Sequence, residues 1–328
     1  MKTKKLKKRI LHLERSAYSN STLSELSKKY SVIFYEFNNV KDFNIYLKNN
    51  QFEVIFTKLG VSLGKEQINA QKELKIIVTP TTGYNHIDIN YAASKGIKII
   101  GLKNHKKFLS SVKSTAEHTW ALILSLSRNL NTAIAKTKET QRWERLPYTA
   151  DELNGKTLGV IGYGRLGKMV GDYGNVFGMK VLANDIDKNA FKEKPDYIEN
   201  TSLNNLLKNS DYVILLISWS SENIYFFDDI KFSKMKKGAF FVNSSRGEFI
   251  DEDSLLKNLK SEKLAGAALD VLNGDSSWSS DTKISNKLFN YSLKNENIII
   301  TPHMGGYGKT SIAKTRNFIV SLFLKEIF

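Results

Sequence analysis

The segment KTLGVIGYGRLGKMVG, residues 156–171, constrains the fold more than any other part of the sequence. An apolar run ends in three glycines, Gly162, Gly164 and Gly167, and a helical pattern follows. In dinucleotide-binding α/β folds the first such glycine permits a tight turn, the second lets the backbone approach a pyrophosphate, and the third lets the helix pack on the sheet. The segment therefore predicts a strand, a turn and a helix. Its N–H groups and dipole suit a phosphate, although three glycines can also serve turn geometry alone.

A carboxylate at the end of the next predicted strand favours the dinucleotide interpretation. This strand is MKVLAND, residues 179–185, and it ends at Asp185. A carboxylate in this place accepts hydrogen bonds from the hydroxyls of an adenosine ribose and repels a 2′-phosphate. No arginine follows it in NDIDKN, and Lys188 is the one cation there. We therefore expect NAD rather than NADP as the cofactor.

Short apolar runs and helical patterns alternate on both sides of the glycine segment. Alternation of this kind predicts parallel, doubly wound sheets. We expect an α/β fold of two doubly wound parallel-sheet domains, in which a Rossmann NAD-binding domain of residues 111–303 is inserted in a flavodoxin-like substrate domain. The substrate domain would comprise residues 1–110 and 304–328, so that the last helix, from about Thr310, packs back on the first domain.

A long helix is predicted between the two domains, at STAEHTWALILSLSRNL, residues 114–130. Ser114 and Glu117 have the spacing of a capping box at its start. Its apolar positions are typical of a buried helix.

The composition narrows the classes of function. The net charge is +16 and the pI is about 9.6, but the basic residues are mostly lysines spread along the whole chain, so we expect no nucleic-acid partner. A basic face that binds RNA stays open as an alternative. No apolar window has the length of a membrane span, and we expect no membrane partner. The chain has no cysteine, which suits the cytoplasm, and its histidines lack the spacing of metal ligands, so no metal is expected.

Residues suited to carbonyl reduction follow several predicted strands of the second half. Hydride transfer to a keto group needs a proton donor and a cation that holds an anionic substrate. Arg246 lies in VNSSRGEF, Asp270 and Asp275 lie in and after AALDVLNGD, and His303 lies in IIITPHMGGYG. Open α/β sheets bind their ligands at such strand ends. Taken singly, His303 and Arg246 are ordinary structural residues, and Asp275 could simply cap a turn in a polar loop.

Six motifs give the chain its resemblance to a known family. TTGYNHID, STAEHTWALILSLSR, the glycine segment, NSSRG, LAGAALDV and TPHMGG occur in this order. The chain resembles the D-isomer-specific 2-hydroxyacid dehydrogenases, a family that includes D-lactate, hydroxypyruvate and phosphoglycerate enzymes. The resemblance implies an NAD-dependent oxidoreductase of a small anionic 2-hydroxy or 2-keto acid. It also implies a homodimer whose seam includes the long helix.

The resemblance implies a role for each matching residue. Arg246 would bind the substrate carboxylate, with the backbone N–H groups of Gly83 and Tyr84, and His303 would be the acid or base paired with Asp275. Lys58 is selected by its position instead, in TKLG at the end of a predicted strand of the first domain, where it would meet a phosphate or second carboxylate of the substrate, or is plain surface. The remaining positions would line the cofactor: Arg165 and Leu166 at the pyrophosphate, Asp270 at the nicotinamide end, and Ile217, Asn223, Ser244, Ser245 and Gly305 along the cleft.

Two departures from the family pattern affect the expected site. Asp275 stands where the family usually has a glutamate, and its shorter arm should reach His303 only by a backbone shift or a bridging water. In LLISWSSENIYFF, Leu216 and Ser218 replace the usual His and Pro, which should reshape the rim beside the nicotinamide. Formate dehydrogenases pair the histidine with glutamine and fit less well. A non-catalytic NAD-sensing scaffold or corepressor remains an alternative function.

Overall fold

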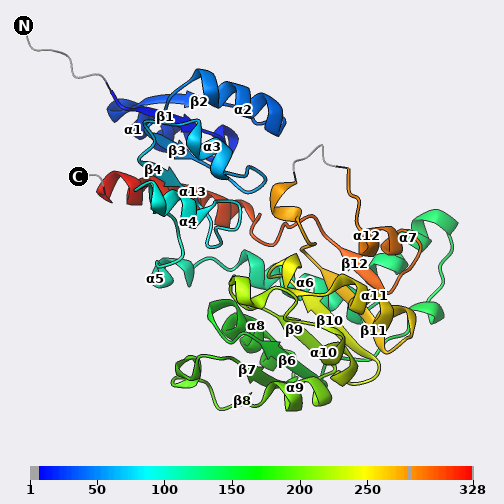
Figure 1. The fold of residues 1–328 in the computed structure, drawn as a ribbon. Coiled ribbons are helices and arrows are strands. Elements are labelled where there is room, and N and C mark those ends of the chain that lie inside the picture. Colours follow the sequence, from blue (N-terminus) through cyan, green and yellow to red (C-terminus); the bar gives the residue numbers. More distant parts are fainter. Residues whose placement is uncertain (1–6, 279–282, 327–328) are drawn as a thin grey trace, which may run out of the picture. The chain divides into compact units, whose positions relative to one another are not determined.

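The computed structural model describes residues 7–278 and 283–326, and the chain divides into two compact units. One unit contains Met1–Val112, Ser276–Thr282 and Gly308–Phe328, and the other contains Lys113–Asp275 and Lys283–Tyr307. Each unit is built on one parallel sheet (Figure 1), which confirms the predicted α/β class. Among the described residues, no helix is both long and apolar enough to cross a membrane. The assignment of substrate to the first unit and dinucleotide to the second stays a prediction.

The sheet of the first unit has five parallel strands. These are β1 (Arg9–His12), β2 (Ser31–Phe34), β3 (Val54–Phe56), β4 (Ile76–Val78) and β5 (Lys98–Ile100). Their order is β2-β1-β3-β4-β5, which is the flavodoxin-like order. The order reverses between β1 and β3, and sheets of this kind bind ligands at the carboxyl edge near such a reversal.

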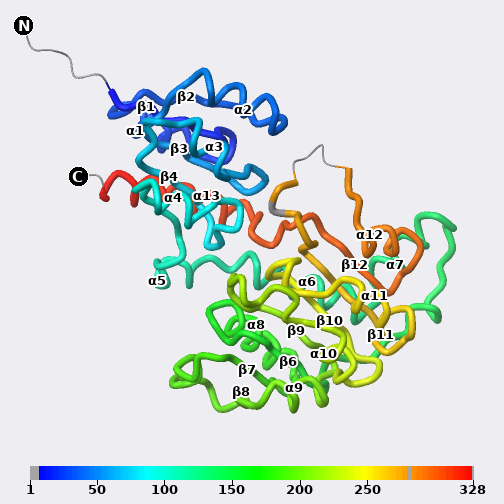
Figure 2. The backbone as a smooth tube through the Cα atoms, viewed as in Figure 1, coloured from blue at the N-terminus to red at the C-terminus, as the bar shows by residue number. Residues whose placement is uncertain are grey.

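Helices cover both faces of this sheet, because consecutive apolar residues along its strands point to opposite faces. The helices of the unit are α1 (Asn20–Lys29), α2 (Val40–Asn49), α3 (Lys65–Asn69), α4 (Ile89–Ser94), α5 (Lys106–Leu109) and α13 (Lys309–Glu326). Ile10 packs with α1 and α13, whereas Leu11 packs with α2, α3 and α4 on the opposite face. In Figure 2 the red tube of α13 lies beside the blue and cyan N-terminal segments, and contacts with α1 and β5 hold it there.

The sheet of the second unit has seven parallel strands. These are β6 (Thr157–Ile161), β7 (Lys180–Asn184), β8 (Ile198–Asn200), β9 (Tyr212–Leu215), β10 (Ala239–Asn243), β11 (Leu264–Leu269) and β12 (Ile298–Ile300). Their order, β12-β11-β10-β9-β6-β7-β8, contains the Rossmann order and reverses between β6 and β9. The sequence patterns predict all of them except β8, a three-residue strand of which only Ile198 is buried.

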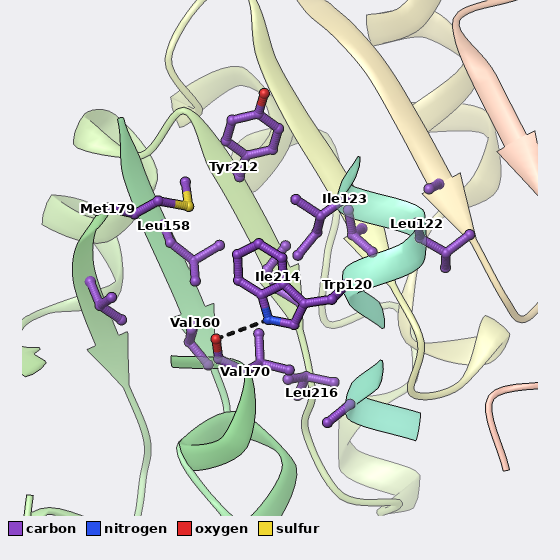
Figure 3. Close-up of a cluster of buried hydrophobic side chains, with 14 of the residues drawn as sticks. Trp120, Leu122, Ile123, Leu158, Val160, Val170, Met179, Tyr212, Ile214 and Leu216 are labelled. Carbon is purple, nitrogen blue, oxygen red and sulfur yellow. Dashed lines mark hydrogen bonds between the residues drawn. The ribbon is translucent and has the colours of Figure 1, made fainter. Parts of the chain in front are cut away.

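The core of the second unit packs α6 and α8 on one face of the sheet. The helices of the unit are α6 (Ser114–Ser127), α7 (Leu130–Thr140), α8 (Arg165–Val176), α9 (Leu203–Asn209), α10 (Asp229–Lys234), α11 (Glu252–Lys260) and α12 (Lys287–Ser292). Trp120 of α6 fills the centre, and its indole N–H donates to the carbonyl O of Val170 in α8 at 3.2 Å (Figure 3). Leu122, Ile123 and Leu126 are buried with it, so the expected buried helix is confirmed.

Two details of the long helix differ from the sequence prediction. Ser114 does not cap it, since its hydroxyl donates to the carbonyl O of Gly305 at 2.8 Å and Lys113 is the N-cap residue. The helix ends at Ser127 rather than near residue 130, because Asn129 takes a left-handed conformation with φ of 50° and starts α7. The buried side chains of α6 lie in the core of their own unit, and the dimer seam at this helix stays a prediction.

Candidate active site

Three glycines shape the turn between β6 and α8. Gly162 has φ of +92°, and a Cβ there would lie 2.7 Å from the backbone C and O of Leu216. A Cβ at Gly167 would lie 2.1 Å from the carbonyl O of Gly162. Around Gly164, no atom of the described residues comes within 4 Å of such a Cβ, and no side chain there caps α8. The turn therefore leaves open space at a helix N-terminus, where N–H groups can bind an anion.

Asp185 lies beside this turn, at the end of β7. Its Oδ2 accepts a hydrogen bond from the backbone N–H of Tyr163 at 2.7 Å, and its Oδ1 accepts one from the N–H of Asp187 at 2.8 Å. These bonds fix the orientation of the carboxylate. The next side chain, Ile186, is 98% exposed. A fixed carboxylate followed by an exposed apolar group is suited to the ribose and base of an adenosine.

The segment after β9 borders the glycine turn on its other side. A Cβ on Gly162 would lie 2.9 Å from the backbone N of Ile217, which places the backbone of this residue at the turn. Asn223, at the end of a short 3₁₀ helix, donates from Nδ2 to the carbonyl O of Ser218 at 3.0 Å. Trp219 stacks on Phe249 with 5.7 Å between ring centroids. This aromatic contact holds the segment against the 3₁₀ helix that follows Arg246.

Asn243 organises the turn after β10, and the sequence analysis did not select it. Its Oδ1 accepts hydrogen bonds from the N–H and hydroxyl of Ser245, at 3.0 and 2.8 Å, and its Nδ2 donates to the carbonyl O of Arg246 at 2.9 Å. Ser244 shares a hydrogen bond of 2.6 Å with Thr119 of α6. Both serines therefore hold the loop that presents Arg246.

Asp270, at the end of β11, fixes the loop that carries His303. Its Oδ1 accepts from Thr301 Oγ1 at 2.7 Å and from Met304 N at 2.9 Å, and its Oδ2 accepts from Gly305 N at 2.7 Å. His118 Nε2 donates to Oδ1 at 3.0 Å, a contact that the sequence analysis missed. Burial alone would raise the pKa of Asp270, but the hydrogen bonds, led by that from His118, lower it below its ordinary value.

His303 and Asp275 form a direct pair. The His303 Nδ1 lies 3.0 Å from Asp275 Oδ2, and the exposed fractions of the two side chains are 21% and 7%. An ionised carboxylate can only accept, so Nδ1 carries the shared proton and Nε2 is left for exchange with another group. Leu272 N donates to the same carboxylate oxygen at 3.2 Å. The contact is direct, so no bridging water is needed, and the other expectation for the shorter aspartate, a backbone shift, stays a prediction.

The backbone of His303 adopts a rarely populated conformation. Its φ is 51°, in the left-handed region that residues with a side chain seldom occupy. The His303 N–H donates to the carbonyl O atoms of Asp270, at 2.8 Å, and of Thr301, at 2.9 Å. These bonds offset the cost of the conformation, which is the kind of strain found at functional sites.

Arg246 is a half-buried cation beside this pair. Its Nη1 donates to the carbonyl O of Ser245 at 2.6 Å, while its Nε is buried and has no hydrogen-bond partner within the described part of the chain. Burial lowers the pKa of Arg246, and the nearby carboxyl groups of Asp275 and Glu248 oppose this effect. The unpartnered Nε and the planar guanidinium suit a bound carboxylate. Glu248 is a further group that the sequence analysis did not select.

The three candidate substrate residues of the first unit follow neighbouring strands of its sheet. Lys58 comes just after β3 and is half-buried. Gly83 follows β4, and its carbonyl O accepts from the hydroxyl of Thr81 at 2.7 Å. Tyr84 lies with its ring against Gly101, and burial raises the pKa of its phenol. The described residues contain no group of His, Cys, Asp and Glu that could hold a metal ion.

Comparison with known protein families shows the family to which the chain belongs. The family model described as "D-isomer specific 2-hydroxyacid dehydrogenase, NAD binding domain" matches residues 120–305, more than half of the chain. The chain belongs to the D-isomer specific 2-hydroxyacid dehydrogenase family. The matched residues contain the glycine turn, Arg246, Asp275 and His303. The protein is thus an oxidoreductase with a domain for a nicotinamide dinucleotide.

Individual relatives agree with this assignment. A Staphylococcus aureus protein named as a 2-hydroxyacid dehydrogenase is 29% identical over 86% of each chain. The structure is similar to that of D-lactate dehydrogenase from Aquifex aeolicus complexed with NAD and lactic acid, with a TM-score of 0.80, 28% identity, and coverage of 97% of this chain and 95% of that one. The fold is also shared by an acyclic imino acid reductase complexed with NADPH and D-Arg, with a TM-score of 0.77, 23% identity and 97% coverage of both.

Proposed function

We propose that this dehydrogenase interconverts a small D-2-hydroxy acid and its 2-keto acid with NAD as cofactor. The observation that carries the proposal is the direct pair of His303 and Asp275 beside Arg246, whose buried Nε has no hydrogen-bond partner among the described residues. NAD, when bound, accepts or supplies a hydride at carbon 2 of the substrate. The residues of the chain do the rest: Arg246 binds the substrate carboxylate, and His303 Nε2 gives a proton to the reacting oxygen in reduction and takes it in oxidation.

Asp275 keeps the imidazole ready for this proton transfer. Its Oδ2 is bonded to both His303 Nδ1 and Leu272 N, so the ring cannot turn without breaking a charge-assisted hydrogen bond. Nε2 therefore stays directed away from the carboxylate. We keep the other predicted cofactor positions in the proposal: Gly162, Gly164, Arg165, Leu166, Gly167, Asp185, Ile217, Asn223, Ser244, Ser245, Asp270 and Gly305.

The preference for NAD over NADP rests on Asp185. The structures similar to this one include complexes with NAD and with NADPH, so the fold itself accepts both. At the end of β7, the carboxylate of Asp185 is fixed by two backbone N–H groups and cannot swing away from a ribose. A 2′-phosphate placed there would meet a fixed negative charge. This repulsion favours NAD.

We propose that the first unit contributes Gly83, Tyr84 and Lys58 to substrate binding. In support, Lys58 and Gly83 follow the adjacent parallel strands β3 and β4, whose carboxyl ends share one edge of the sheet. Backbone N–H groups at Gly83 and Tyr84 suit one carboxylate, and the amine of Lys58 suits a second anionic group. The Aquifex relative was solved with lactic acid, a substrate of this size class.

The first experiment is a rate measurement. NADH oxidation would be followed by absorbance with glyoxylate, hydroxypyruvate, pyruvate, longer 2-keto acids and 3-phosphohydroxypyruvate. We expect turnover of at least one of them, lost in His303→Ala and retained in His105→Ala, a histidine of the first unit that packs on Phe318. Binding of NADH without turnover of any of them would instead favour a non-catalytic NAD-sensing scaffold.

We further propose that the protein is a homodimer. The support is an apolar stripe on α7 and the segment after it, where Leu130, Ile134, Trp143 and Leu146 are exposed, the last two by 81% and 87%. Exposed apolar groups concentrated in one region mark interaction surfaces. Replacing Trp143 and Leu146 by serine should convert a dimer into a monomer in size-exclusion chromatography with light scattering. The cytoplasmic location stays a prediction.

A further inference from the structure

Glu248 is a half-buried acid for which the proposed reaction has no use. It lies in a short 3₁₀ helix, Gly247–Phe249, directly after Arg246. One side of its carboxyl group takes a hydrogen bond from its own backbone N–H. The other oxygen, Oε2, is buried and has no hydrogen-bond partner in the described part of the chain. A buried polar atom in this state needs a physical explanation.

Close backbone packing brings Glu248 to the acid–base pair. A Cβ added to Gly247 would lie 2.0 Å from the carbonyl C of Leu272 and 2.4 Å from the N of Asn273. The glycine therefore lets this helix lie directly against the segment that leads to Asp275. As a result, Glu248 interacts electrostatically with Asp275.

The groups that surround Glu248 come from several segments. Arg246 precedes it in the chain, Asp275 lies in the 3₁₀ helix Asp275–Ser277, and His303 follows β12. Tyr225 contacts it through the backbone, since its N–H donates to the carbonyl O of Glu248 at 2.9 Å. Asp275 and burial both favour the neutral acid, whereas Arg246 and His303 favour the carboxylate. Burial is the largest of these effects, and the pKa of Glu248 lies above its ordinary value.

Three buried polar atoms of this cluster lack hydrogen-bond partners among the described residues. They are Arg246 Nε, Glu248 Oε2 and Asp275 Oδ1. Two of them are acceptors when ionised, and one is a donor. Two ionised carboxylates that share one guanidinium repel each other and any further anion. Adding a proton to Glu248 removes one negative charge and supplies an O–H donor for an acceptor of the cluster.

We propose that Glu248 is a positioning residue that links the binding of an anionic substrate at Arg246 to the uptake of one proton. The inference rests on the proposed function, because the anion is taken to be the substrate carboxylate. Ionised Glu248 and Asp275 both attract Arg246 and oppose a third negative charge. When the anion binds, Glu248 takes a proton from solvent at Oε2, and it returns the proton when the anion leaves.

The test uses oxamate, an unreactive anion of the shape of a 2-keto acid, with the full-length protein saturated with NADH. Its dissociation constant would be measured between pH 5 and pH 8.5 for the wild type, Glu248→Gln and Glu252→Gln. We expect Glu248→Gln to bind oxamate on the order of threefold to tenfold more tightly than the wild type at pH 8, because a charge repelling the anion is gone. The two should converge as the pH is lowered, because the wild-type acid then gains its proton.

Glu252→Gln is the matched control. Glu252 is also a half-buried glutamate with a raised pKa caused by burial, but its carboxylate accepts from Asn273 N at 2.9 Å and from Asn286 Nδ2 at 2.7 Å. Its affinity for oxamate should follow the wild type at every pH. Glu248→Asp, which retains a carboxyl group, should keep the pH dependence. In weakly buffered solution with an indicator dye, wild type should take up more protons on oxamate binding than Glu248→Gln.

The outcomes separate the inference from the proposed function. Equal pH dependence and equal proton uptake in wild type and Glu248→Gln would overturn the inference while keto acid turnover still supports the proposed function. Proton-linked oxamate binding without turnover of any keto acid would support the inference and contradict the proposed reaction. If wild type binds no oxamate in the presence of NADH, no anion site exists at Arg246 and both proposals are wrong.

Discussion

Replacing Asp270 by asparagine should destabilise the second unit and loosen the loop of His303. The carboxylate accepts from the side chains of His118 and Thr301 and from the backbone of Met304 and Gly305, and it is 2% exposed. An asparagine has one acceptor oxygen, so its NH₂ group would face a donor that now bonds to a carboxylate. Leaving one buried donor unsatisfied and weakening the other bonds costs about 2–4 kcal/mol.

The loss should appear as a fall in melting temperature of roughly 5–12 °C in calorimetry. The size of this fall should also depend on pH. The pKa of Asp270 is lowered in the folded state, so its stabilisation is fully present above the unfolded value of about 4 and is lost as pH falls through the folded value. The difference between wild type and Asp270→Asn should therefore shrink in acid.

Asp229→Asn serves as the control for this experiment. Asp229 also accepts two side-chain hydrogen bonds, from Lys257 at 2.7 Å and Asn258 at 3.1 Å, but its side chain is 46% exposed. Exposed ion pairs contribute little, so its melting temperature should change by no more than about 2 °C. If Asp270→Asn lowered the melting temperature by no more than Asp229→Asn does, the four hydrogen bonds would not hold the loop, and the reasoning would be refuted.

Three further substitutions test the cofactor and acid–base sites. Gly164→Ala should leave the melting temperature unchanged, because no described atom lies within 4 Å of the new Cβ. The same variant should bind NADH about tenfold or more weakly in a fluorescence titration, since the methyl group enters the space proposed for the pyrophosphate. Asp185→Ser should reduce the ratio of kcat/KM for NADH over NADPH by about tenfold or more, because the repelling charge is removed. Asp275→Glu should lower kcat for keto acid reduction, because Asp275 Oδ2 already lies 3.0 Å from His303 Nδ1 and the added methylene would push the carboxylate into the ring. An increase in kcat would contradict this geometry.

Local patterns were sufficient to predict the two sheets. Each strand of four or more residues is an apolar run with helical patterns around it, and the glycine spacing marks the start of α8. The strand β8 escaped prediction because two of its three residues are polar and exposed. The end of α6 escaped it because Asn129, a residue with acceptable helix propensity, takes a left-handed conformation that its neighbours do not signal.

The acid–base residues and their pairing could be selected from the sequence, but the side chains that hold their loops could not. Arg246 and His303 stand in motifs that can be recognised along the chain. His118 reaches Asp270 from a helix more than a hundred residues earlier, and Asn243 folds its turn through side-chain bonds that many other residues could have replaced. Such contacts depend on which elements become neighbours in the sheet. Spacing along the chain carries no information about them.

The aspartate at position 275 shows how backbone packing can replace side-chain length. A shorter arm suggested that the contact with His303 needs a backbone shift or a bridging water, and the separation in the structure is that of a direct hydrogen bond. Gly247 favours this contact, since its missing Cβ lets the backbone of Leu272 and Asn273 lie against the helix after Arg246. The same packing sets Glu248 beside Asp275. A second carboxyl group near the pair is therefore a consequence of the geometry that makes the short acid sufficient, and the pH dependence of anion binding should reveal it.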